Sequence, residues 1–366
     1  ISSNESTFIV KALAAGTRLD GRRRLETRRL RIMFGEQLGS VELHMGATKV
    51  FAVASADLVE PYPDRAAEGL LHFHVEFSPM AAQSFEAGRP SEAAIELMRL
   101  LERTLRKSQA IDVETLCVVA GRRVWSIRCD VTVLDHRGNL CDCTSLAALA
   151  ALKHLRIPAV SVVGTGDDAT VKVLAREQAE PLPLVFHHTP VAITFGLFQA
   201  DAARADGRSV LVAIDPTDRE ELVMPGSLVV VLNQYGELCG LHKPGGLPIE
   251  VAQAVECARQ AADVAPTMLT ALESALDVQL AKLADEAAAL SRTGRLPPPR
   301  PADRGGQLPL SIQTVPVDLA AGAEAKTDLA AAPEGALQES SGTGSGPGCA
   351  EGESAPPTKR HKGAGF

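Results

Sequence analysis

Three arginines on one face of a predicted helix are of the type and spacing that suit the binding of phosphate groups. Arg99 and Arg103 lie one helical turn apart, and planar guanidinium groups can hold successive phosphates of a nucleic acid. The acidic residues precede the arginines, an order that the helix dipole favours without any ligand. The pattern alone therefore fits both a nucleic-acid-binding face and a solvated helix face that binds nothing. The charged residues follow one another at helical steps of three or four: Glu92, Glu96, Arg99, Arg103 and Arg106.

Two other groups of residues have side chains of the types that bind metal ions. His72, His74 and Glu76 fall on one side of a predicted strand because side chains alternate along it, but a polar strand face at a subunit contact explains them better. Cys141 and Cys143 are the only close pair among seven cysteines, and no second pair follows at the spacing of a zinc knuckle. The sequence therefore predicts reduced thiols, no metal and no cofactor.

Composition and missing motifs exclude several classes of protein. The 366 residues are 45% hydrophobic, enough for one large core or two modest ones. A net charge of −8 excludes a uniformly basic surface but permits a local basic face. No run of about 18 apolar residues occurs, so we expect a soluble, intracellular protein. Signatures of P-loop NTPases, dinucleotide-binding enzymes, zincins and α/β-hydrolases are absent from the sequence.

The elements that must position these residues follow from hydrophobic periodicity. Ser91 is a suitable N-cap for a helix that ends at Lys107, and a helix over Thr144–Leu155 is apolar almost all round. The Ala/Leu-rich stretch Ile249–Leu290 predicts two helices that separate near Pro266. Ten strands are predicted: Glu26–Phe34, Val41–Leu43, Lys49–Asp57, His72–Phe77, Arg123–Val133, Ala159–Val163, Thr170–Val173, Val191–Phe198, Val210–Ile214 and Ser227–Leu232.

Strand clusters followed by helix pairs predict an α+β layered fold rather than a doubly wound sheet. The chain after about residue 293 is rich in proline and glycine and has no aromatic residue before Phe366, so we expect a disordered tail. Near its end, Lys359–Lys362 form a small basic cluster that is either a nuclear-import signal or a solvated tail segment.

Several segments, in this order along the chain, resemble the ribonuclease PH family. The central ones are similar to the ring subunits of the eukaryotic RNA exosome within that family. The resemblance extends over roughly Glu5 to Leu290, which is nearly the whole predicted folded part. The segments are Arg18–Arg22, Glu68–Leu71, Glu76–Ala82, Phe85–Arg89, Glu102–Arg106, Ile111–Gly121, Val124–Arg128, His187–Pro190 and Asp215–Glu221.

This resemblance implies a ribonuclease PH fold of two β-sheet and helix layers, similar to domain 2 of ribosomal protein S5. The N-terminal part is expected over 1–190, the C-terminal part over 191–292 and the tail over 293–366. The implied partners are single-stranded RNA, the other ribonuclease PH-like subunits of a hetero-hexameric ring, cap proteins with S1 or KH domains, and associated hydrolytic exoribonucleases, with no membrane. The implied locations are the nucleus, including the nucleolus, and the cytoplasm.

The resemblance also implies that this chain is not an enzyme. Active relatives hold the attacking phosphate with a Gly-Gly-Thr-Arg-like turn before the buried helix, whereas this chain has Asn139, Leu140, Cys141 and Asp142 there. The hydroxyl and the guanidinium are missing, and the carboxylate of Asp142 is expected where the anion would sit. Glu180 is expected to correspond to the catalytic aspartate of active members.

Arginines spaced like Arg99 and Arg103 hold RNA in inactive archaeal relatives, which favours the same role here. Arg106, further along the stripe, and Arg89, in the preceding turn, are further candidates for RNA binding. The leading hypothesis is a non-catalytic, RNA-binding structural subunit of the exosome ring. Such a subunit supports 3′-to-5′ maturation of ribosomal RNA, processing of small nuclear and nucleolar RNA, and surveillance and turnover of messenger RNA. The alternatives are an active phosphate-dependent 3′-to-5′ exoribonuclease and a scaffold without RNA contact.

Overall fold

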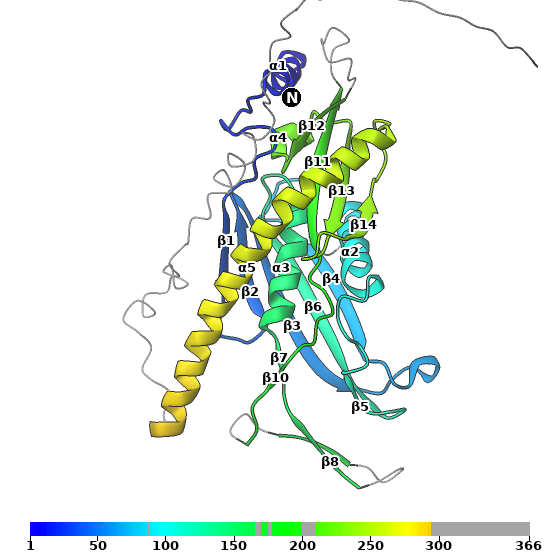
Figure 1. The fold of residues 1–366 in the computed structure, drawn as a ribbon, viewed down its shortest axis with the longest axis vertical. Coiled ribbons are helices and arrows are strands. Elements are labelled where there is room, and N and C mark those ends of the chain that lie inside the picture. The colour runs from blue at the N-terminus through cyan, green and yellow to red at the C-terminus, as the bar shows by residue number, and fades with distance from the viewer. Residues whose placement is uncertain (87, 89, 165–169, 175–177, 200–209, 294–366) are drawn as a thin grey trace, which may run out of the picture. The chain divides into compact units, whose positions relative to one another are not determined.

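The computed structural model describes residues 1–86, 88, 90–164, 170–174, 178–199 and 210–293. This part of the chain contains a mixed β-sheet and an antiparallel β-sheet, and one buried helix packs against both (Figure 1). The predicted α+β layered class is therefore confirmed. The predicted tail beyond Thr293, with Lys359–Lys362, lies outside the described residues, and so does Arg89.

The first sheet has the strand order β1-β2-β3-β6-β4, with β5 paired to β6. Neighbouring strands are antiparallel except β4 and β6, which run parallel. Burial alternates along the strands because successive side chains point to opposite faces, so one face carries the core. The strands are β1 (Leu30–Phe34), β2 (Ser40–Met45), β3 (Thr48–Val59), β4 (Leu70–Phe77), β5 (Cys117–Val119) and β6 (Arg123–Asp135).

The second sheet is antiparallel, with the strand order β12-β11-β13-β14. Both faces of β11 are buried: Phe195 belongs to the main core, whereas Phe198 packs on the other face against Ile9 and Leu13. These last two residues come from the N-terminal helix α1 (Ser3–Ala14), which was not predicted. The strands are β11 (Val191–Gln199), β12 (Val210–Ile214), β13 (Gly226–Leu232) and β14 (Leu238–His242), of which β14 was not predicted either.

Helix α3 (Leu140–His154) lies between the two sheets. Its central alanines have no exposed surface, and their small side chains let strands approach the helix closely from two sides. The predicted helix, apolar almost all round and buried between layers, is confirmed. It begins four residues earlier than expected because Asn139 caps it, and its side chain accepts a hydrogen bond of 3.3 Å from the N–H of Asp142.

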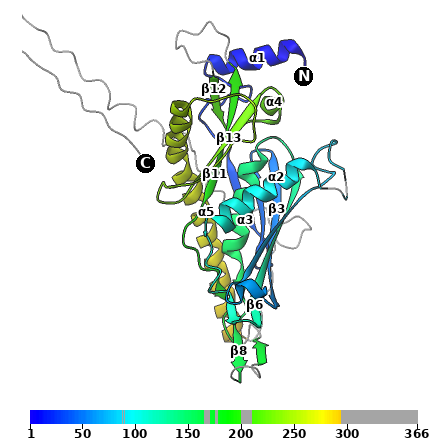
Figure 2. The same cartoon turned by 90° about the vertical axis from the view of Figure 1, so that its right-hand side faces the viewer.

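Helix α2 (Glu92–Leu101) lies beside α3 and β4 (Figure 2). Ser91 caps it as predicted, because the hydroxyl accepts a hydrogen bond of 3.2 Å from the N–H of Ala94. The predicted α-helix does not continue to Lys107, since the chain widens into the π-helical segment η2 (Glu102–Lys107). Hydroxyls of Thr104 and Ser108 bond to nearby helix carbonyls there, which competes with the regular ladder of backbone hydrogen bonds.

The C-terminal stretch forms one helix, α5 (Val251–Thr293), so the prediction of two helices is wrong. Pro266 lies within α5 with its side chain exposed. It removes one backbone donor, but the apolar face continues past it through Ala265 and Met268, which are both buried. Packing of this face therefore outweighs the break that a proline favours.

The remaining elements are short. Strand β1 begins at Leu30 rather than at Glu26, because the preceding residues are held by hydrogen bonds to Asp215 instead of by a neighbouring strand. No helix within the described ranges is long and apolar enough to cross a membrane. The short elements are η1 (Pro63–Arg65), β7 (Arg156–Ile157), β8 (Val160–Val163), β9 (Thr170–Val173), β10 (Leu182–Pro183) and α4 (Asp218–Glu221).

Candidate functional site

The predicted arginine face is exposed. Arg99, at the end of α2, and Arg103 and Arg106, on η2, all have exposed side chains on the same side of the helix. Within the part of the chain that the structure describes, the guanidinium groups of Arg99 and Arg106 have no hydrogen-bond or ion-pair partner. Arg103 instead contacts His242 of β14, with 3.2 Å between Nη1 and Nδ1. Two of the three arginines are thus free to bind an anion.

The turn before α3 has a conformation that glycine makes possible. Gly138 has φ +89°, and a Cβ atom there would lie 2.5 Å from the backbone nitrogen of Asp218. The next residue, Asn139, is also left-handed with φ 52°, a conformation that asparagine tolerates better than most residues. The carbonyl of Gly138 accepts a hydrogen bond of 2.8 Å from the Thr48 hydroxyl. The turn is therefore packed tightly against α4 and the first sheet.

The backbone amide at the start of α3 is occupied by a carboxylate of the protein itself. Glu221, at the end of α4, accepts a hydrogen bond of 2.7 Å from the N–H of Asn139 through Oε1. Its other oxygen, Oε2, lies 3.7 Å from Nε2 of His136. Burial raises the pKa of Glu221 to about 7. The chain's own side chain thus lies on an amide beside the turn that holds the attacking phosphate in active relatives.

Asp142 does not present its carboxylate to an incoming anion, so that part of the prediction is wrong. Its side chain is buried and turns toward the second sheet. There Oδ1 accepts a hydrogen bond of 2.6 Å from the Thr194 hydroxyl, and Oδ2 accepts one of 3.0 Å from the Thr194 N–H. Nδ2 of Asn139 also donates to Oδ2, at 2.7 Å. Burial raises the pKa of Asp142 to about 7, against the lowering effect of these hydrogen bonds. Asp142 joins α3 to β11.

Arg28 and Asp215 form a buried ion pair behind the same turn. Nε and Nη2 of Arg28 donate to the two carboxylate oxygens at 2.9 and 2.7 Å, while its other donors reach Thr48 and two backbone carbonyls. All five N–H donors of this guanidinium therefore have acceptors within the chain. Burial raises the pKa of Asp215, but the hydrogen bond and the charge of Arg28 prevail and lower it. This arginine is not available to a ligand.

Two segments of the family resemblance meet at this cluster. Arg18 donates to the carboxylate of Glu220 and also to the carbonyls of Ile214 and Asp215 at 2.7 and 2.8 Å. Arg22 donates a hydrogen bond of 2.9 Å to Oδ2 of Asp215. Both Arg18 and Glu220 are buried. No sequence pattern predicts this contact between Arg18–Arg22 and Asp215–Glu221, although the two segments carry opposite charges.

Glu180, which the resemblance matches to the catalytic aspartate of active members, does not lie in this cluster. It is exposed and precedes β10, which pairs with β7 just after the C-terminal end of α3. Its charge acts on Arg156 there, opposing the burial that lowers the pKa of that arginine. A helix of 15 residues is about 22 Å long, so Glu180 and Asn139 lie at opposite ends of α3.

The other predicted candidates are spread over α3 and β4. Leu140 and Cys141 are partly buried and pack against the core, and the Cys143 thiol is fully buried. His72, His74 and Glu76 alternate with core residues along β4 and are exposed, as their spacing predicts. No group of three or more His, Cys, Asp or Glu side chains among the described residues is arranged to hold a metal ion.

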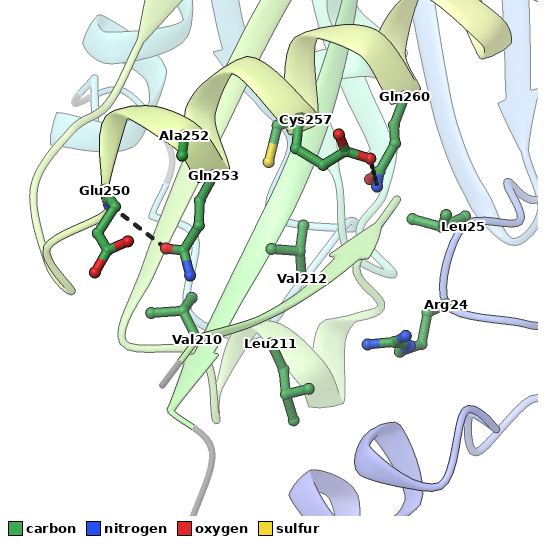
Figure 3. Close-up of a pocket in the computed structure, with 11 residues that line it drawn as sticks. Arg24, Leu25, Val210, Leu211, Val212, Glu250, Ala252, Gln253, Cys257 and Gln260 are labelled. Carbon is green, nitrogen blue, oxygen red and sulfur yellow. Dashed lines mark hydrogen bonds between the residues drawn. The ribbon is translucent and has the colours of Figure 1, made fainter. Parts of the chain in front are cut away.

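A separate pocket of about 300 Å³ lies between β12 and the first turns of α5 (Figure 3). Val210, Val212 and Cys257 form apolar parts of its wall, whereas Arg24 and Gln253 are among its polar lining residues. None of the residues predicted for RNA binding or catalysis lines this pocket.

Comparison with known proteins places this geometry in a family. Residues 26–158 match the model of domain 1 of the 3′ exoribonuclease family, and residues 188–264 match domain 2. The chain is 44% identical over 262 residues to the exosome complex component RRP45B of Arabidopsis thaliana, covering 71% of this chain and 58% of that protein. It is 41% identical over 277 residues to RRP45A of the same plant, covering 76% of this chain and 87% of that protein.

A solved structure described as the Archaeoglobus fulgidus exosome with RNA bound to the active site is similar with a TM-score of 0.60 and 26% identity. The match covers 71% of this chain and 94% of that one. The chain thus belongs to the 3′ exoribonuclease family and has the ribonuclease PH fold. Within this family it is similar to the exosome complex components of the RRP45 type, which confirms the resemblance noted from the sequence.

Proposed function

We propose that this chain is a non-catalytic subunit of the exosome ring that contacts single-stranded RNA and supports its 3′-to-5′ processing and degradation. The observation that carries the proposal is the hydrogen bond from the N–H of Asn139 to the carboxylate of Glu221. A side chain of the protein occupies the amide beside the turn that must bind phosphate for phosphorolysis. The chain also lacks the hydroxyl and the guanidinium of that turn, because Leu140 and Cys141 stand in their positions.

The nearest cations support the non-catalytic role. Arg28 uses all five donors within the chain, and Arg18 and Arg22 are committed to Glu220 and Asp215. A phosphate bound here would have to break a buried ion pair, and removing one partner of such a pair typically costs about 3–5 kcal/mol. The cluster therefore acts as a structural link between the N-terminal segment, the first sheet and the second sheet.

RNA contact is proposed for the arginine face on α2 and η2. The free, exposed guanidinium groups of Arg99 and Arg106 are suited to exposed phosphates, and Arg103 lies between them in the sequence. The similar archaeal exosome structure is described as containing RNA. The proposed partners are the other ribonuclease PH-like ring subunits, cap proteins with S1 or KH domains and hydrolytic exoribonucleases, and the proposed locations are the nucleus, including the nucleolus, and the cytoplasm.

The test of RNA contact is photocrosslinking of labelled single-stranded RNA to the reconstituted ring. Changing Arg99 and Arg103 together to Glu should reduce crosslinking to this chain while the ring still assembles. Arg259→Glu is a matched control, because Arg259 is an exposed arginine on the surface of α5. Crosslinking that is unchanged by the double substitution would favour a scaffold without RNA contact.

The test of catalysis uses the same ring with RNA and inorganic phosphate. We expect that this chain catalyses no release of nucleoside diphosphates from the RNA. Release of nucleoside diphosphates that disappears with Glu221→Gln, a substitution that keeps an acceptor for the Asn139 amide, would show that the site is active and would overturn the non-catalytic assignment.

A further inference from the structure

Of the three arginines on the proposed RNA-binding face, Arg103 differs in having a partner. Its Nη1 lies 3.2 Å from Nδ1 of His242, and Nε2 of the same imidazole lies 3.0 Å from Oε1 of Glu96. The three side chains thus form a continuous chain of polar contacts from α2, through β14, to η2. Neither the loss of catalysis nor the packing of the core accounts for this arrangement.

Elementary chemistry fixes the direction of both hydrogen bonds. A guanidinium has only donors, so Nδ1 of His242 must accept from Arg103. In a neutral imidazole the other nitrogen then carries the proton, and Nε2 donates to the carboxylate of Glu96. Glu96 therefore selects the tautomer of His242 that is able to receive Arg103.

The elements that carry the three residues are held together by packing. Leu100 of α2 is buried against Val229 and Val231 of β13, and Cys239 of β14 packs against the same cluster. His242 pairs with Val229 in the strand register. Its side chain is only 19% exposed, whereas that of Glu96 is 47% exposed. The imidazole is thus a partly buried, fixed point beside a long and exposed arginine side chain.

We propose that His242 is a positioning residue for RNA binding, which holds the guanidinium of Arg103 in place for a phosphate of single-stranded RNA. This inference rests on the proposed RNA contact of the arginine face. Contact with His242 uses one of the five donors of Arg103 and leaves the others available. Arginine loses much rotamer freedom when it binds, and a side chain that is already ordered in the free protein avoids part of that loss.

The experiment measures the affinity of the reconstituted ring for a fluorescein-labelled single-stranded oligouridylate by fluorescence anisotropy at one fixed salt concentration. The ring contains the full chain as wild type, His242→Ala, His242→Gln, Arg103→Ala, or the double variant His242→Ala with Arg103→Ala. Ordering one side chain costs about 0.5–1.5 kcal/mol, so His242→Ala should weaken binding by about two- to tenfold. Because glutamine offers both an acceptor and a donor, His242→Gln should restore most of the affinity.

The double variant separates positioning from a direct contact. If His242 acts through Arg103, His242→Ala should cause no further loss of RNA affinity in a ring whose Arg103 is already replaced by alanine. An equal loss in both backgrounds, no effect of His242→Ala on the wild-type ring, or a His242→Gln ring as weak as the alanine variant would overturn the inference.

Single substitutions Arg99→Ala and Arg106→Ala in the same assay distinguish this failure from failure of the proposed function. If either weakens RNA binding while Arg103→Ala and His242→Ala do not, the arginine face binds RNA but His242 does not position it. If none of the three arginine substitutions changes the affinity, the RNA contact itself is wrong, and the role of His242 falls with it.

Discussion

The carboxylate of Glu221 accepts a hydrogen bond of 2.7 Å from the backbone N–H of Asn139, the residue that caps α3. Glu221 comes from α4, which is 82 residues away in the sequence, and both residues lie beside the buried pair Arg28–Asp215. A helix N-terminus favours an anion because its first amides point outward without intrahelical partners. In this chain an intramolecular side chain satisfies the adjoining amide, so the hydrogen bond that an external anion could receive is made within the folded chain.

Removal of this acceptor should destabilise the protein. Glu221→Ala leaves the N–H of Asn139, a buried residue, without its partner, which typically costs about 1–3 kcal/mol. Glu221→Gln keeps an acceptor oxygen and should lose less. The measurement is the free energy of unfolding of the full chain in urea. Equal losses for the two variants would show that the charge of Glu221, rather than its hydrogen bond, stabilises the turn.

The stability of the chain should fall as the pH rises through neutrality because of Asp142. Burial raises the pKa of Asp142 from 3.8 to about 7. Between about pH 4 and 7 the folded state therefore keeps a proton that the unfolded state has released, so this contribution is complete below pH 4 and is lost as the pH passes 7. Glu221 acts in the same direction, since burial raises its pKa to about 7 as well.

Asp142→Asn isolates the contribution of Asp142. An asparagine amide can still accept from the Thr194 N–H and donate to the Thr194 hydroxyl, but it does not titrate. Urea unfolding at pH 5 and pH 8 should show a smaller loss for this variant than for the wild type. Parallel pH profiles for the two proteins would contradict the assigned cause, because the Glu221 contribution is present in both.

Two ion pairs of equal length should differ in their effect on stability. Arg28 and Asp215 are 2.7 Å apart with side chains 9% and 1% exposed, whereas Arg219 and Glu5 are also 2.7 Å apart but 63% and 35% exposed. Arg28→Met leaves a buried carboxylate without its main partner and should cost about 3–5 kcal/mol. Arg219→Met should cost less than about 1 kcal/mol, because solvent screens an exposed pair. Similar losses in urea unfolding would mean that burial does not set the strength of these pairs.

The sequence predicts those elements whose periodicity is set by burial. The core strands and the buried helix α3 were predicted because alternation or continuous apolarity marks them. Strand β14 was missed, although a turn signal precedes it: the side chain of Asn233 accepts hydrogen bonds from the N–H groups of Tyr235 and Glu237. Helix α1 was missed because only Ile9 and Leu13 are buried, too few to give a strong apolar stripe.

The polar cluster was less predictable than the arginine face. The spacing of Arg99, Arg103 and Arg106 is local, so the helix period alone predicts that they share a side. Asp215 and Arg28 are 187 residues apart, and only the pairing of sheets and the path of the chain bring them together. The position of Glu180 along the chain does not indicate the end of α3 near which it lies, because that depends on the pairing of β10 with β7. The sequence signal for the carboxylates of this cluster is the acidic segment Asp215–Glu221, which follows a predicted strand.

Replacement of Pro266 should stabilise the protein. Proline in a helix interior is about 3 kcal/mol less favourable than alanine, because it lacks the N–H and its ring clashes with the preceding turn. Pro266 is exposed and the helix continues through it, so Pro266→Ala removes this cost without leaving a cavity in the core.

We expect Pro266→Ala to raise the free energy of unfolding by about 1–3 kcal/mol, since partial adaptation of the helix has already relieved some of the strain. The matched control is Ala262→Gly on the same helix, which should lower stability by up to about 1 kcal/mol, because glycine is less favourable in a helix interior. Unchanged or reduced stability of Pro266→Ala would mean that the bend caused by the proline is needed to place the buried residues on both sides of it against the sheets.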